Sequence, residues 1–338
     1  MINFYSDTQT LPTRAMREAA LDAPTGDERH GGCPTTNALN ARVAALLGME
    51  AAVFLPSGTM CNEIAIAVHC RPGDEVICAR ESHIIFAESG GPAALSGVMM
   101  HPLDAERGMF DVDQLRGAIR RPSSFAPRSR LLVTEQTSNL GGGAVWPLDR
   151  LNAVAAAAKQ EGLATHLDGA RILNASVATG LPPEVYARHH DSAWIAFTKG
   201  LGCPVGAVLA GSREFIDRAW LFKRRWGGAM RQTGVLTAMC LYALDHHVER
   251  LADDHALARR IADGLADAPA LARVVAPDTN IVIAELAADG PDADALLEHL
   301  KARELKVTRI GARRIRIVTH MNVGEAEADQ LIAAIHAA

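Results

Sequence analysis

The amino-acid sequence predicts an α/β protein, in which a large domain with a mostly parallel sheet precedes a smaller α+β domain. Three observations support this prediction. The chain has 338 residues, more than one ordinary domain needs. From residue 51 onward, short apolar runs alternate with longer segments rich in alanine and leucine, as in strands joined by crossover helices. Near residue 245 the pattern changes, so we expect the large domain, with an N-terminal arm, over 1–245 and the small domain over 246–338.

The large domain contains seven strand candidates, because each run is short, apolar and bounded by turn-forming residues. They are residues 51–55, 76–79, 98–101, 131–135, 164–167, 194–197 and 206–210. The segments between them are expected to be helical. One example covers 149–161, where alanine and leucine recur at helical spacing behind Pro147. The Pro/Ser stretch at 121–130 is expected to form a surface loop.

The small domain is expected to open with a long charged helix over residues 246–267. The pattern then predicts a strand at 280–285, a helix near 292–303, a strand at 314–318 and a terminal helix. Strands and helices therefore alternate in this tail as well.

Composition and charge exclude several classes of protein. A hydrophobic share of 49% and a charged share of 22% are ordinary for a folded globular chain. The net charge of −5 offers no basic surface for nucleic acid. No run of ~18 apolar residues suits a bilayer, and the first residues do not resemble a secretion signal. We therefore expect a cytoplasmic protein that binds neither nucleic acid nor membrane.

Cysteine and histidine patterns give no indication of a metal site. The six cysteines contain no Cys-x-x-Cys pair, so we interpret them as small apolar residues that stay reduced. The adjacent pairs His189-His190 and His246-His247 do not have the i, i+3 or i, i+4 spacing by which helical residues share a ligand. We interpret them as surface or capping residues and expect no metal.

A possible phosphate site follows the first predicted strand. Doubly wound sheets bind ligands beyond the carboxyl ends of their strands. There the sequence reads Leu55-Pro56-Ser57-Gly58-Thr59 before a predicted helix, and a helix N-terminus favours anions. An ordinary Ser/Thr helix cap explains this segment equally well.

Polar residues follow three further strands. Asp168 ends one strand, and Lys199 ends the next, in the Gly-rich segment Thr198-Lys199-Gly200. An isolated loop lysine is usually solvated. A lysine amine can, however, form a Schiff base with pyridoxal phosphate, which also needs a carboxylate at its ring nitrogen and a phosphate cradle. His83 could lie over such a ring, although a core or capping histidine is the alternative.

Seven segments in order resemble the low-specificity L-threonine aldolases. They extend from about residue 3 to residue 320, nearly the whole chain. The segments are Ser6-Asp7-Thr8, Pro24-x-Gly26-Asp27, Leu55 to Thr59, His166-Leu-Asp-Gly-Ala-Arg171, Thr198-Lys-Gly-Leu-Gly-Cys-Pro-Val-Gly206, Gly227-Gly-Ala-Met-Arg-Gln232 and Ile315-Arg-Ile-Val-Thr-His320.

The resemblance implies the aspartate-aminotransferase-like, fold-type I architecture of enzymes that use pyridoxal 5'-phosphate. It implies cleavage of L-3-hydroxy-α-amino acids, such as threonine, allo-threonine or phenylserine-like compounds, to glycine and an aldehyde. A β-eliminating lyase, or another enzyme reacting at the α-carbon, is the alternative because the cofactor groups are shared. It also implies a homo-oligomer, a dimer or a dimer of dimers, whose sites are shared between subunits.

Individual roles carry over with the motifs. Lys199 matches the Schiff-base lysine and Asp168 the acid at the pyridine nitrogen. His83 matches the imidazole that stacks on the cofactor near the substrate hydroxyl, and we expect it, with a water that it positions, to be the base. The remaining matches are the phosphate cup of Ser57, Gly58 and Thr59; Ser6, Arg171 and Arg316 around the substrate carboxylate, with Arg171 also near the cofactor; and Arg231, supplied across a subunit contact toward the phosphate.

Two residues depart from the family pattern. Ser138 stands in Glu135-Gln136-Thr137-Ser138-Asn139, where a histidine near the β-substituent is usual. His30 stands where a tyrosine is usual. Both are expected near the substrate, so bulky β-substituents should gain relative to threonine.

Overall fold

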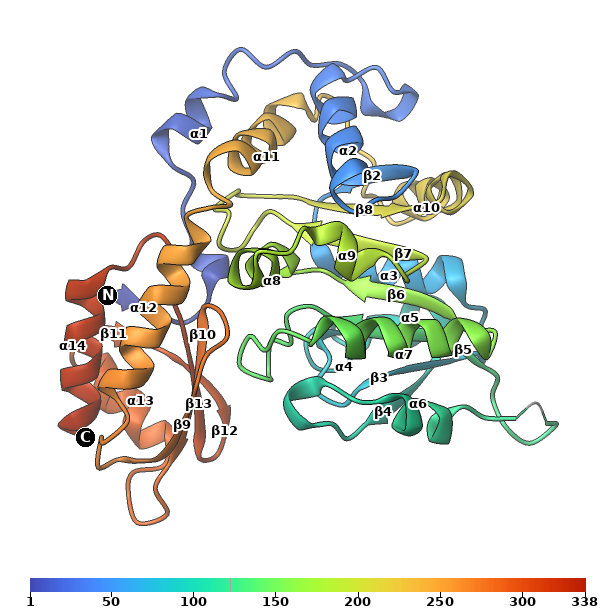
Figure 1. Cartoon of the computed structure of the whole chain (residues 1–338). Helices are drawn as coiled ribbons and strands as arrows, with labels where there is room; N and C mark the ends of the chain where they lie inside the picture. Colours follow the sequence, from blue (N-terminus) through green and yellow to red (C-terminus); the bar gives the residue numbers. More distant parts are fainter. Residues whose placement is uncertain (122) are drawn as a thin grey trace.

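The computed structural model describes residues 1–121 and 123–338. Its large region is built on a seven-stranded sheet with the order β2-β8-β7-β6-β5-β3-β4 (Figure 1). The strands are β2 (Ala51–Leu55), β3 (Glu75–Ala79), β4 (Met99–Leu103), β5 (Ser129–Glu135), β6 (Ala164–Asp168), β7 (Ser192–Ala196) and β8 (Ala207–Gly211). All pairs from β4 to β7 are parallel, and β8 runs antiparallel to both β2 and β7. The predicted mostly parallel α/β fold is confirmed.

Each of the seven predicted runs coincides with one strand, and no strand end differs from its prediction by more than two residues. The strands form because their side chains alternate between two apolar environments. Val53 and Leu55 belong to the apolar cluster on one face of the sheet, and Phe54 belongs to the cluster on the other.

Helices cover both faces of this sheet (Figure 1). The face of Val53 packs against α3 and α10, whereas the opposite face packs against α2, α7, α9 and α11. The helices of this region are α1 (Arg14–Glu18), α2 (Pro34–Leu46), α3 (Gly58–His69), α4 (His83–Phe86), α5 (Gly91–Ser96), α6 (Val112–Ala118), α7 (Leu148–Gln160), α8 (Ile172–Thr179), α9 (Pro183–Ala187), α10 (Arg213–Arg225) and α11 (Gly234–His246).

The C-terminal region has its own sheet, in the order β12-β13-β10-β9, with its helices on one side (Figure 1). Its elements are α12 (Leu251–Gly264), β9 (Leu271–Val275), β10 (Ile281–Leu286), α13 (Ala293–Lys301), β11 (Leu305–Lys306), β12 (Thr308–Gly311), β13 (Arg314–Val318) and α14 (Glu325–His336). The first residues of the chain join this region, because β1 (Ile2–Asn3) pairs with β11 and Phe4 lies in its apolar core.

The prediction of a single long helix over 246–267 is wrong at its start, because this helix begins only at Leu251. The structure has two helices, α11 and α12, separated by residues 247–250. His247 ends α11, because its N–H bonds back to the Ala243 carbonyl and its ring Nδ1 lies 2.8 Å from the Leu201 carbonyl oxygen. This tertiary bond ties the helix end to the loop that follows Lys199.

Among the described helices, none has both the length and the apolar character that a bilayer span requires. Of the predicted loop at 121–130, residue 122 lies outside the described part of the chain. Phe125 in this loop is exposed, and residues from Ser129 onward already belong to β5.

Candidate active site

The carboxyl ends of β5, β6 and β7 bring three ionisable side chains together. Glu135 and Asp168 are the last residues of neighbouring strands and are paired in register. Lys199 follows β7 by three residues, and its Nζ lies 5.5 Å from the centre of the Trp194 ring. The edge at which ligands are expected in such sheets therefore carries an amine and two acids.

Lys199 has an environment that favours its neutral, nucleophilic form. Burial lowers the pKa of the Lys199 amine, and the nearby Arg171 charge lowers it further. Asp7, Asp168 and Glu135 oppose this shift in part. A lysine with a lowered pKa attacks carbonyl groups more readily than a solvated one.

Asp168 is a buried carboxylate that is held in one orientation. Its Oδ2 accepts a hydrogen bond of 2.8 Å from Asn62 Nδ2, and its Oδ1 accepts one of 3.0 Å from the Ala170 N–H. Asn62 is itself fixed, because its Oδ1 accepts a 2.8 Å bond from Trp194 Nε1. The carboxylate is therefore pre-positioned on α3 and β6 together.

The segment at Ser57, Gly58 and Thr59 is the start of α3. Ser57 caps this helix, since its Oγ accepts a bond from the Met60 N–H at 3.2 Å, so the capping interpretation holds. A Cβ on Gly58 would lie 2.2 Å from a Trp194 ring carbon, so only glycine lets the helix start approach β7. The other first-turn N–H groups still point along the helix axis, where an anion is favoured.

His83 begins α4 and belongs to the same network. Its N–H donates to Glu135 Oε2 and its ring Nδ1 lies against Glu88 Oε1, both at 2.8 Å. Burial alone would lower the pKa of His83, but the bond to Glu88 and the charges of Asp168 and Glu135 raise it above its ordinary value. Burial and the Asp168 charge also raise the pKa of Glu135 to about 7.

Arg171 and Asp7 form a buried bidentate ion pair. Arg171 Nε and Nη2 donate to the two Asp7 oxygens at 2.8 and 2.7 Å, and Asn280 Nδ2 donates to the same carboxylate. Burial alone would raise the pKa of Asp7, but Arg171 holds it well below its usual range. Ser6 lies beside this pair and caps a short helical turn through its Oγ. Much of the Arg171 guanidinium is thus occupied by Asp7.

Arg316 is the arginine of this group with a spare donor. Its Nη1 donates to Asn139 Oδ1 at 2.7 Å and its Nη2 to the Tyr5 carbonyl at 3.3 Å. Its Nε is buried and has no hydrogen-bond partner in the described residues. A buried donor without an acceptor is costly, and a ligand carboxylate would satisfy it.

His30 and Arg231 lie apart from this network within one chain. Both side chains are exposed, and their segments bind each other through the Glu28 N–H and the Arg231 carbonyl at 3.1 Å. Glu28 forms a buried ion pair with Lys223 of α10 at 2.7 Å. Within the described residues, no hydrogen bond links either predicted residue to Lys199 or Asp168.

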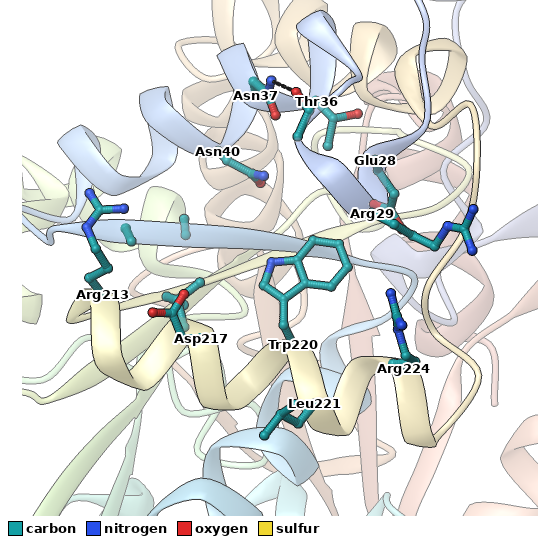
Figure 2. A pocket seen from close by; sticks show the side chains of 14 residues that line it. Glu28, Arg29, Thr36, Asn37, Asn40, Arg213, Asp217, Trp220, Leu221 and Arg224 are labelled. Carbon is teal, nitrogen blue, oxygen red and sulfur yellow. Dashed lines mark hydrogen bonds between the residues drawn. The ribbon is translucent and has the colours of Figure 1, made fainter.

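A separate pocket adjoins these two residues (Figure 2). Trp220 projects from α10 toward Arg29, which lies on the short 3-10 helix of residues 28–30. Asn40 of α2 lines the other side. The lining includes none of the three ionisable groups at the β5–β7 edge, so this pocket is distinct from the site.

Ser138 is buried in the loop after β5, and its side chain faces two glycines. A Cβ on Gly108 would lie 2.3 Å from Ser138 Oγ, and a Cβ on Gly141 would lie 2.7 Å from it. On the side where the Ser138 hydroxyl lies, the two glycines therefore leave little room for a larger side chain.

We expect Ser138→His to lower the free energy of unfolding by ~1–3 kcal/mol, the usual cost of overpacking. Ser138→Ala should unfold within ~0.5 kcal/mol of the wild type, because it adds no volume. Urea unfolding of the three proteins measures both effects. If Ser138→His unfolds like the wild type and shifts the phenylserine-to-threonine preference at least tenfold, the side chain faces the substrate instead.

Sequence reasoning missed Asn62 and Glu88. Asn62 lies one turn after Gly58 on α3, so helical spacing alone places it on the side of the phosphate segment and could have identified it. Glu88 follows His83 by five residues through an irregular turn. Its contact with His83 had no sequence signal.

A sheet of this order, with a lysine and an acid at adjacent strand ends, defines the fold-type I architecture of pyridoxal-phosphate enzymes. The fold resembles that of Leishmania major threonine aldolase, with a TM-score of 0.82 at 20% identity, covering 99% of this chain and 98% of that one. A variant of Thermus thermophilus aspartate aminotransferase gives a TM-score of 0.77 at 17% identity, covering 99% and 96%.

Sequence comparison places the chain more narrowly. The family model of the beta-eliminating lyases matches residues 3–289. The low specificity L-threonine aldolase of Escherichia coli K12 is 39% identical over 334 residues, 98% of each chain. A probable low-specificity L-threonine aldolase 2 of Arabidopsis thaliana is 38% identical over 98% of this chain and 95% of that protein. The chain belongs to the beta-eliminating lyase family and, within it, to the low-specificity L-threonine aldolases.

Proposed function

We propose that this protein cleaves L-threonine and related L-3-hydroxy-α-amino acids to glycine and an aldehyde, with pyridoxal 5'-phosphate as cofactor. The observation that carries the proposal is the half-buried Lys199 amine, whose pKa is lowered, at the same sheet edge as the buried Asp168. Relatives named for this activity match the chain over nearly its full length. Allo-threonine and phenylserine-like compounds are the further substrates that we propose.

The residues at the sheet edge fit this cofactor. Lys199 would bind its aldehyde carbon, Asp168 would hold the proton on its ring nitrogen, and the start of α3 at Ser57, Gly58 and Thr59 would bind its phosphate. When bound, pyridoxal phosphate supplies an electron sink for the electron pair released as the Cα–Cβ bond breaks.

We propose that His83 is the base that accepts the proton of the substrate β-hydroxyl. Its Nδ1 is engaged by Glu88, which leaves Nε2 to accept a proton. The bond to Glu88 and the neighbouring acids raise the pKa of His83 above its ordinary value. Histidine is the side chain whose ordinary pKa suits a general base near neutral pH. Such a base contributes typically ~10²–10⁴-fold in rate.

We propose that Arg316 and Ser6 bind the substrate carboxylate. The support is the buried Arg316 Nε that lacks an acceptor in the described chain. Arg171, held by Asp7, would contribute charge beside the cofactor and the carboxylate rather than a free guanidinium fork. Because Asp7 neutralises Arg171, the site does not hold two unpaired guanidinium charges, those of Arg171 and Arg316.

We also propose a homo-oligomer, at least a dimer, in which the segment with His30 and Arg231 reaches the site of a second copy. Both side chains are exposed, and Leu221 on the neighbouring α10 is an exposed apolar residue, which supports a contact there. Six buried, unpaired cysteines support a reducing compartment such as the cytoplasm.

The test is product analysis with the purified holoenzyme. Incubation with L-threonine should release equal amounts of glycine and acetaldehyde, because cleavage between Cα and Cβ partitions all substrate atoms between these two products. Ammonia and 2-oxobutyrate in their place would instead identify a β-eliminating lyase. The same incubation with L-allo-threonine and phenylserine ranks the β-substituents.

A further inference from the structure

Two carboxyl groups are buried side by side behind His83. Glu63 on α3 is 3% exposed, and Glu88, between α4 and α5, is 5% exposed. The two carboxyl groups are close enough for Glu88 to raise the pKa of Glu63. A Cβ on Gly91, the first residue of α5, would lie 1.9 Å from Glu63 Oε1, so the carboxyl group is inserted tightly against that helix.

The hydrogen bonds around this pair are incomplete without a proton between the two acids. Glu88 Oε1 accepts from Asn62 Nδ2 and contacts His83 Nδ1. Glu88 Oε2 and both oxygens of Glu63 have no donor among the described residues. Two buried carboxylates in contact cannot both ionise at neutral pH, and one shared proton turns an orphaned acceptor into a donor.

The charges around the pair assign that proton to Glu63. Glu88 Oε1 already accepts from the Asn62 donor and contacts the His83 ring, whereas neither oxygen of Glu63 has a donor among the described residues. Among the described residues, Glu88 is the one charged group that shifts Glu63, and burial together with Glu88 raises the pKa of Glu63 to about 8. The other charged groups of this region are not among the causes that shift Glu63: Glu135 and Asp168 act on His83, and Lys199 and Lys223 act on Cys61.

We infer that Glu63 is a positioning residue for His83: as a neutral acid it donates a hydrogen bond to Glu88 Oε2, which keeps Glu88 ionised and bonded to His83 Nδ1. This inference rests on the proposed function insofar as His83 Nε2 is the base. Without the Glu63 donor, Glu88 holds a proton more strongly and can donate it to Nδ1, which places the ring hydrogen on Nε2 and removes its lone pair from the substrate side.

The experiment compares Glu63→Gln, which keeps a donor, with Glu63→Leu, which removes it. Glu184→Gln, an exposed acid on α9, is the matched control. In the pH profile of kcat/KM, the acidic limb should stay in place for Glu63→Gln and Glu184→Gln. It should move up by about one pH unit for Glu63→Leu, because a carboxylate that has lost a hydrogen bond attracts the His83 ring proton more strongly and raises the pKa of His83.

A second readout is independent of turnover. The infrared difference between the wild type and Glu63→Gln at pH 7 should contain a buried carboxylic-acid carbonyl band, and the difference between the wild type and Glu184→Gln should not. Any band from Glu135, whose pKa is about 7, is common to all three proteins and cancels. Since the folded pKa of Glu63 lies above its ordinary value of 4.5, the native state keeps a proton that the unfolded state loses. Stability from this group therefore falls as pH rises from about 4.5 to about 8, and Glu63→Gln should remove that fall.

The outcomes separate this inference from the proposed function. If the wild type releases no aldehyde but shows the Glu63 acid band, the proposed function is refuted, while the shared proton between Glu63 and Glu88 still stands. Absence of the band at pH 7, or equal losses of kcat/KM in Glu63→Gln and Glu63→Leu with unmoved acidic limbs, would overturn the inference and leave only a packing role. If Glu63→Leu does not fold, the infrared and stability results for Glu63→Gln decide.

Discussion

Lys199→Ala should reduce kcat with L-threonine by more than ~10²-fold. Loss of one proton-transfer group alone typically costs ~10²–10⁴-fold, and this substitution also removes the amine that binds the cofactor. The lowered pKa of Lys199 makes it the amine in the site best suited to attack an aldehyde. Wild-type enzyme treated with borohydride should carry the cofactor on the peptide that contains Lys199. Mass spectrometry of the digest measures this directly.

Lys159→Ala is the control for this substitution. Lys159 forms a half-exposed ion pair with Asp191 at 2.9 Å, and such surface pairs contribute ~0–1 kcal/mol to stability. It should retain both turnover and the Lys199 adduct. Recovery of the reduced cofactor on Lys159 or Lys223 would refute the assignment of Lys199.

Asp168→Asn should retain the cofactor and lose about 10²–10³-fold in kcat, the usual effect of removing one preorganised electrostatic group. The amide cannot hold the ring-nitrogen proton. In the wild type, each Asp168 oxygen accepts a hydrogen bond, one from Asn62 Nδ2 and one from the Ala170 N–H. The asparagine amide has only one oxygen, so its NH₂ group must face one of these donors. Cofactor absorbance and steady-state kinetics separate binding from turnover.

Asn62→Ala is an informative companion, because it removes a donor to Asp168 without removing the carboxylate. It should reduce kcat less than Asp168→Asn does. Turnover of Asp168→Asn within about threefold of the wild type, ~0.7 kcal/mol, would show that the acid has another role.

The sequence by itself determined the sheet and the main chemical groups of the candidate site. Strands such as β2 were predictable because a strand that is covered by helices on both faces is a short apolar run, bounded in the sequence by turn-forming residues. Asp168 and Lys199 were predictable because ligands bind at the carboxyl ends of parallel strands, which the chain order already specifies.

Only the tertiary structure decided how these groups are held. Arg171 pairs with Asp7 across 164 residues, and Glu63 meets Glu88 where α3 packs against α5. No local periodicity encodes such contacts, because they depend on how helices and loops pack once the sheet has formed. The same holds for Ser138, because one of its two glycine neighbours, Gly108, comes from a distant segment of the chain. Backbone propensity and strand order thus fixed where the chemistry lies, while long-range packing fixed the charge and hydrogen-bonding state of each group.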